Sequence, residues 1–150
     1  RRGCLETVSS GTAIAREANR VVSEGRKTIM ADEIKEGKKE VTAPDVFAAA
    51  ARGDRAAQEI LDTAIGYLGT AFINIINVLN PSVLVVGGGV AEAGEALFAP
   101  LRAMVAKNAV SHMAENVVLK KAALGTEAGA AGMLCLLQQY RREGFHAFRS

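Results

Sequence analysis

A short apolar segment that runs into three consecutive glycines constrains the fold of this 150-residue chain more than any other stretch. An Asn-Pro pair at positions 80–81 stops the segment before it, because proline cannot continue a helix. The four apolar residues Val83–Val86 predict a short strand that is buried between two layers. Gly87, Gly88 and Gly89 follow, and glycine lets a backbone turn sharply and approach a ligand closely. We expect a small molecule to bind at this turn.

The longest predicted helix precedes this turn, from a capping residue at Asp54 to about Leu79. Small residues interrupt it, so another backbone can approach closely, and we expect a central helix that is buried on more than one side. Its apolar residues recur at helical spacing: Leu61, Ile65, Leu68, Phe72, Ile75 and Leu79.

Local signals predict further helices on both sides of the central one. Thr42 and Asp45 form a capping box that starts a helix ending near residue 52. Polar residues 26–41 are expected to form a surface excursion with a short helix at best. Pro100 favours a start later than Glu95 for the helix after the glycines. The remaining helices are expected over three segments: residues 11–24, 95–109 and 128–142.

The strands are too few for an ordinary sheet. Residues 117–122 provide a second strand candidate, and two short strands cannot make a sheet of usual size. Either the fold is mainly helical, or the partners of these strands belong to a segment that is missing from the chain.

Composition excludes several classes of function. The net charge of +2 is too small to indicate nucleic acid or a membrane surface as a partner. The apolar run 64–79 is too short and too polar to span a bilayer, and no signal peptide is visible. Cys4 and Cys135 do not make a disulfide framework, so a reducing cytoplasm is expected.

The residues alone leave the candidate sites open. The glycine turn either contacts a nucleotide or phosphate through its N–H groups or is a plain turn, and neither a dinucleotide fingerprint nor a P-loop is present. Cys4 reads as a free thiol and Cys135 as a core residue. His112, expected in a loop, and His146, in the tail, stand singly. The sequence therefore shows no catalytic constellation.

Several motifs in this order resemble the ROK family, named for repressors, open reading frames and kinases, which includes bacterial glucokinases. The resemblance covers the chain from its first residue to about Leu137. It rests on five segments: Gly3-Cys4-Leu5-Glu6, Ser10-Gly11-Thr12-Ala13, Asn77-Val78-Leu79-Asn80-Pro81, Val85-Val86-Gly87-Gly88-Gly89-Val90 and Gly125-Thr126-Glu127-Ala128-Gly129-Ala130-Ala131-Gly132.

The resemblance implies a fold and a set of site residues. Residues 1–150 are similar to the carboxyl-terminal lobe of an α/β, helix-rich, actin-like ATPase (ribonuclease H-like) fold. Glu6 resembles a glutamate that binds sugar hydroxyls, and Gly87 to Gly89 resemble the loop against which the adenosine of ATP lies. Cys4 resembles the last of one histidine and three cysteines that hold a structural zinc. The phosphate loop and catalytic aspartate of the family would lie in an amino-terminal half that is absent here.

The implied reaction is the transfer of the γ-phosphoryl group of Mg-ATP to a hexose, with glucose as the expected substrate. This chain alone is expected to be inactive, and the protein is expected to be cytoplasmic and either a homodimer or associated with the missing half. A sugar-responsive repressor of the same family is one alternative. A non-catalytic helical interaction module is another.

Overall fold

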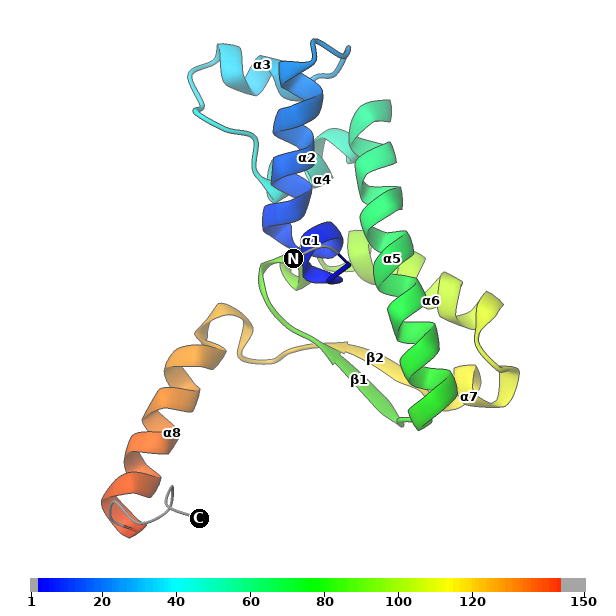
Figure 1. Cartoon of the computed structure of the whole chain (residues 1–150), viewed down its shortest axis with the longest axis vertical. Helices are drawn as coiled ribbons and strands as arrows, with labels where there is room; N and C mark the ends of the chain where they lie inside the picture. The colour runs from blue at the N-terminus through cyan, green and yellow to red at the C-terminus, as the bar shows by residue number, and fades with distance from the viewer. Residues whose placement is uncertain (1–2, 144–150) are drawn as a thin grey trace.

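The computed structural model describes residues 3–143, in which a group of helices lies beside a two-stranded sheet and one helix stands apart (Figure 1). The first part of the chain forms five helices: α1 (Glu6–Ser9), α2 (Gly11–Ser23), α3 (Met30–Lys35), α4 (Ala43–Ala51) and α5 (Arg55–Leu79). The rest forms strand β1 (Val83–Val86), 3-10 helix η1 (Gly89–Ala93), α6 (Glu95–Asn108), α7 (Ser111–Asn116), strand β2 (Val118–Lys121), 3-10 helix η2 (Gly125–Glu127) and α8 (Ala128–Glu143).

Helix α5 is the centre of the helical group, as predicted, and packs against α1, α2, α4 and α6. The Asp54 carboxylate caps it by accepting a hydrogen bond from the backbone N–H of Ala57 at 2.9 Å. The helix ends at Asn80, whose φ of 44° is left-handed, directly before the predicted stop at Pro81. Local chemistry therefore sets both ends of this helix.

The predicted apolar stripe of α5 is buried only in its first part. Ile75 is 37% exposed and Leu79 is 70% exposed, so the expectation of a core position was wrong for both. At this end the Asn77 side chain accepts a hydrogen bond from the backbone N–H of Val110, next to α7, and Ile76 is the buried residue. The neighbouring helix, and not the periodicity alone, decides which face is covered.

The apolar run 64–79 was expected to be too short and too polar to span a bilayer, but it is part of the longer helix α5. Among the described residues, this helix of 25 residues is long and apolar enough to cross a membrane by length and composition. Its packing against five other helices, α1, α2, α4, α6 and α7, explains the same apolar composition by burial of the faces in contact.

The capping box that starts α4 is confirmed. The Asp45 carboxylate accepts a hydrogen bond from the backbone N–H of Thr42 at 2.9 Å. The excursion before it holds only the short helix α3, as predicted, which is anchored by the buried side chain of Met30.

The two strands pair in parallel, with Val83 opposite Val118 and Val86 opposite Lys121. The prediction of a strand buried on both faces was wrong, because Val83 is 45% exposed and Val85 is 61% exposed. Burial alternates along β1, since the helices cover one face and the described residues supply no layer on the other.

Helix α6 starts at Glu95 and contains Pro100, so the later start predicted from this proline was wrong. The carbonyl of Gly94 accepts hydrogen bonds from the N–H groups of Leu97 and Phe98 at 2.9 and 3.0 Å, and both of these side chains are buried. The first turn therefore forms through burial, which offsets the cost of Pro100, a residue that removes one backbone hydrogen bond and crowds the preceding turn.

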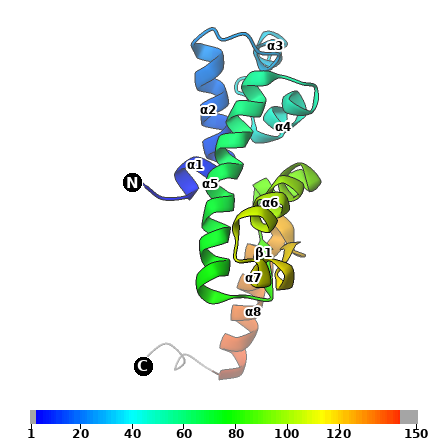
Figure 2. The same ribbon diagram turned by 90° about the vertical axis from the view of Figure 1, so that its right-hand side faces the viewer.

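Helix α8 extends beyond the other helices in both views (Figures 1 and 2), and its contacts are mainly with η2. Cys135 lies on it and is exposed, so its expected core position was wrong. The leucines around it, Leu134, Leu136 and Leu137, are exposed as well. His112 lies in α7 and not in a loop, and His146 lies outside the described residues.

Candidate functional site

The three glycines form the turn between the carboxyl end of β1 and the start of η1. Gly88 has a φ of +83°, which only glycine adopts without strain, and its carbonyl accepts a hydrogen bond from the N–H of Ala91 at 3.1 Å. Gly87 packs beside Ala122, at the end of β2. Nothing lies within 4 Å of the position where a Cβ of Gly89 would stand. The glycine sequence therefore makes a sharp turn and leaves open space at its last residue.

An open cavity of about 360 Å³ borders this turn. Its walls come from the start of α4, with Pro44 and Phe47, and from η1, with Gly89 and Val90. The lining is mostly apolar, and Glu92 is its one charged residue. The volume lies within the range of pockets that hold small organic ligands. The cavity thus has the size and the apolar walls that a flat heterocyclic base requires.

Ion pairs hold both walls of the cavity. Near the α4 wall, the Lys38 ammonium contacts Asp45 at 2.8 Å and Glu33 at 2.6 Å. Partial burial of Asp45 opposes its ionisation, but the hydrogen bonds from Lys38 and Thr42 outweigh this effect and keep the pKa of Asp45 below its usual value. These contacts fix the amino end of α4.

The η1 wall is tied to the sheet through Glu92 and Lys121. The Lys121 ammonium lies 2.6 Å from Glu92 Oε2, and both side chains are about half exposed. Lys121 pairs with Val86 in the sheet, directly before the glycine turn. The pair therefore joins η1 to the strand beside it.

Glu6, the predicted sugar ligand, is the first residue of α1 and is exposed. In the described part of the chain its carboxylate makes no hydrogen bond or ion pair. Helix α1 is anchored by Ser9, whose buried hydroxyl donates a hydrogen bond to the carbonyl of Ala64 in α5 at 2.9 Å. The hydrogen bond of Ser9 thus holds α1 against α5, and the Glu6 carboxylate at the start of α1 is available to a ligand.

Cys4 lies two residues before Glu6 and is a free, exposed thiol. Among residues 3–143, no three histidine, cysteine, aspartate or glutamate side chains are placed to hold a metal ion. The described residues do not fit zinc by themselves, because a structural zinc site needs four ligands.

The structure brings the segment after Glu6 to the segment after Gly89. A Cβ added at Gly11, at the start of α2, would lie 3.6 Å from Val90 Cγ2 and 3.8 Å from Ala43 Cβ. The starts of α2 and α4 and the η1 turn therefore meet at one place. Sequence reasoning assigned no site role to Phe47, Glu92 or Lys121, because no local pattern shows that α4 lies opposite η1.

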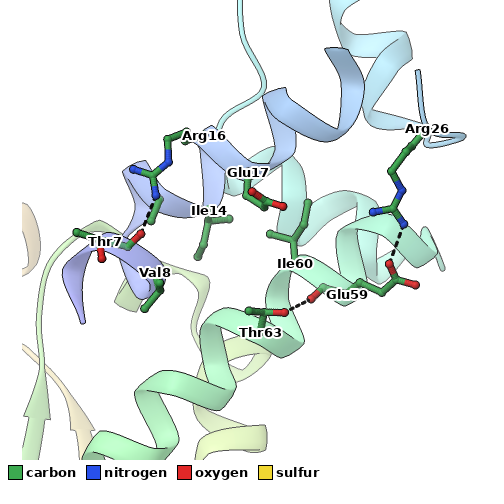
Figure 3. Close-up of a pocket in the computed structure, with 10 residues that line it drawn as sticks. Thr7, Val8, Ile14, Arg16, Glu17, Arg26, Glu59, Ile60 and Thr63 are labelled. Carbon is green, nitrogen blue, oxygen red and sulfur yellow. Dashed lines mark hydrogen bonds and ion pairs between the residues drawn. The ribbon is translucent and has the colours of Figure 1, made fainter. Parts of the chain in front are cut away.

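A second cavity, of about 270 Å³, lies between α1, α2 and α5 (Figure 3). Its charged groups pair with protein atoms: Arg26 contacts Glu59 at 2.8 Å, and Arg16 donates a hydrogen bond to the carbonyl of Thr7 at 2.7 Å. None of the predicted site residues lines it. We therefore base the functional argument on the cavity beside the glycine turn.

A family model described as the ROK family matches residues 1–140. The chain is 41% identical over 138 residues to a protein named Glucokinase from Halalkalibacterium halodurans, in an alignment that covers 91% of this chain and 41% of that protein. It is 23% identical over 142 residues to the DNA-binding transcriptional dual regulator NagC of Escherichia coli, covering 95% of this chain and 33% of NagC.

The fold is similar to that of a ROK family glucokinase from Streptomyces griseus, crystallised in complex with glucose and AMPPNP. The TM-score is 0.73 and the identity 25%, over 93% of this chain and 46% of that chain. The predicted fold class, a helix-rich part of an actin-like ATPase with a small parallel sheet, is confirmed by this similarity. The chain spans less than half the length of these relatives.

Proposed function

The chain belongs to the ROK family, and we propose that residues 1–150 form the carboxyl-terminal lobe of an ATP-dependent hexose kinase with glucose as its substrate. The observation that carries this proposal is the apolar cavity that borders the glycine turn at Gly89. Similarity to glucokinases, one of them crystallised with glucose and AMPPNP, supports the same assignment.

In this proposal each site residue of the chain has a defined task. The glycine turn lets the backbone approach the adenosine of ATP, and the walls around Phe47 and Val90 exclude water from the base. The Glu6 carboxylate accepts hydrogen bonds from sugar hydroxyls and so orients the acceptor. Bound Mg-ATP supplies the γ-phosphoryl group, and the described residues offer no group of ligands for the metal ion. The catalytic base and the phosphate loop belong to the other lobe.

The exposed apolar surfaces support an association with that other lobe. The free face of β1 and the apolar side chains of α8 are uncovered in residues 3–143, and parallel sheets are ordinarily covered on both faces. We expect residues 1–150 alone to be inactive, and the complete protein to be a cytoplasmic homodimer. Cys4 would hold zinc only with ligands from outside this chain.

The test is a kinase assay of the full-length protein that contains this chain, with ATP and a panel of hexoses. Gly88→Ala is the informative variant and Gly53→Ala its matched control, because the two glycines have φ values of +83° and +84° and no neighbour within 4 Å of an added Cβ. Both variants carry similar backbone strain. We expect Gly88→Ala to raise the KM for ATP about tenfold and Gly53→Ala to leave it unchanged.

A sugar-responsive repressor is the second candidate, and the similarity to NagC favours it. It predicts that the full-length protein phosphorylates no hexose and binds operator DNA in a sugar-dependent way. Phosphorylation of a hexose with no DNA binding would exclude it. The absence of both activities would leave the helical interaction module.

A further inference from the structure

We propose that Glu92 selects ribonucleotides by accepting a hydrogen bond from a ribose hydroxyl of the nucleotide, and that Lys121 positions its carboxylate. This inference rests on the proposed nucleotide site beside the glycine turn. It assigns a task to two residues that no sequence motif singles out.

The polarity of the cavity orients the nucleoside. The side chains of Phe47 and Val90 offer apolar walls that suit the faces of a base. Glu92, in contrast, is 47% exposed and remains in contact with water. This half-exposed carboxylate marks the polar rim of the cavity, opposite the apolar walls. The base therefore enters the apolar part, and the more polar ribose remains beside Glu92.

The carboxylate of Glu92 has one oxygen held by the protein and one left for the ligand. Oε2 accepts the hydrogen bond from Lys121 at 2.6 Å. Oε1 accepts no hydrogen bond within the described residues, and it lies 3.2 Å from the position of a Cβ added at Gly125. The absence of a side chain at Gly125, which has a φ of +49°, thus keeps this oxygen uncrowded.

A carboxylate is well suited to a ribose hydroxyl. It only accepts hydrogen bonds when ionised, and a hydroxyl can donate one. Acidic side chains bind the ribose hydroxyls of dinucleotides in other α/β folds for the same reason. Because the bond is charge-assisted, its loss weakens binding by about tenfold.

The experiment measures the Kd of the full-length protein by calorimetry for ADP, 2′-deoxy-ADP and 3′-deoxy-ADP. We expect the unmodified protein to bind at least one deoxy analogue about tenfold more weakly than ADP. Glu92→Ala should weaken ADP binding about tenfold. It should also bring the Kd of that deoxy analogue and the Kd of ADP close to a ratio of one. Lys121→Met should weaken ADP binding by less, about threefold, and keep the ratio, because the carboxylate is still present. Glu95→Ala is the control, since Glu95 is exposed, pairs with Arg102 and does not line the cavity.

The ratio of affinities decides the assignment separately from the kinase proposal, whereas an absence of nucleotide binding would overturn both. The inference is overturned by equal affinities for all three nucleotides, by a ratio that survives Glu92→Ala, or by an absence of nucleotide binding. The kinase proposal fails on a different measurement, the absence of hexose phosphorylation, which the binding ratio does not influence.

Discussion

Helices α6 and α8 both carry leucines at helical spacing, yet only α6 buries them. Leu101 of α6 is fully buried, whereas Leu136 of α8 is 52% exposed. The difference arises because α6 packs against α5 and η1, whereas the contacts of α8 are mainly with the short η2. Apolar content alone therefore does not define a core. A core also requires a neighbouring element that covers it.

The helical group also satisfies its own buried polar groups. Ser9 and Asp54 are its buried polar residues in the described part of the chain, and both side chains make hydrogen bonds. Within the same residues, no buried side-chain nitrogen or oxygen lacks a partner. This group is therefore complete in its polar contacts, while β1 and α8 leave apolar surface uncovered.

The largest expected effect comes from removing a buried leucine. Leu101→Ala should lower the free energy of unfolding by about 3 kcal/mol, because it removes buried methyl groups and leaves a cavity. Leu136→Ala, the same chemical change on α8, should change it by less than about 0.5 kcal/mol in residues 1–150. Urea unfolding of both variants measures the difference.

The same pair of variants tests whether α8 is covered in the full-length protein. If another lobe covers α8, Leu136→Ala becomes costly there, by about 1 to 2 kcal/mol. An equally small effect in both forms would show that α8 stays exposed, and the proposed association through this helix would be wrong.

A smaller effect is expected at the cap of α5. Burial of Asp54 opposes its ionisation, but the hydrogen bonds from Ala57, Ile29 and Thr28 outweigh burial, so the pKa of Asp54 lies below its usual value of 3.8. The ionised carboxylate thus stabilises the folded state above about pH 4, and this contribution is lost as the pH falls through the lowered pKa.

Asp54→Asn replaces the oxygen that accepts from Ile29 and Thr28 with an amide group that cannot accept, so it should cost about 1 to 2 kcal/mol at pH 7 and flatten the dependence of stability on pH in the acid range. Urea unfolding between pH 2 and 7 measures both effects. Asp62→Asn, on the exposed face of the same helix, is the control and should keep the pH dependence. If the free energy of unfolding of Asp54→Asn still falls steeply at acid pH, the pH dependence arises from other groups and not from Asp54.

The smallest effect concerns the close approach of α5 and α6. A Cβ added at Gly69 would lie 2.7 Å from Cε and 2.8 Å from Sδ of Met104, which is the flexible end of that side chain. Gly66, three residues earlier, has no neighbour within 4 Å of an added Cβ. Gly66→Ala should stabilise α5 by up to about 1 kcal/mol through helix propensity, and Gly69→Ala should be about 1 kcal/mol less stable than Gly66→Ala. Thermal unfolding would contradict the close packing if the two variants were equally stable.

Much of the fold follows from local sequence because the signals that start and stop helices act over a few residues. The capping box at Thr42 and Asp45, the cap at Asp54 and the stop at Asn80 are each visible in three or four adjacent residues. The site was predictable in part: the glycine turn was identified from sequence, but its cavity was not, because Phe47 comes from α4 and no local pattern links α4 to η1.

The sequence by itself determined the start of α4, both ends of α5, and that Gly87 to Gly89 form a turn after a strand, but not the start of α6 or the helices α1 and α7. Only the tertiary structure decided which apolar residues are buried, as Val85, Leu79 and Cys135 show by their exposure. It also decided that Glu92 and Lys121 pair beside the turn. The physical reason is the separation of the interacting residues along the chain. Caps and prolines act on residues a few positions away, whereas burial and ion pairing depend on which element of the fold packs against the residue.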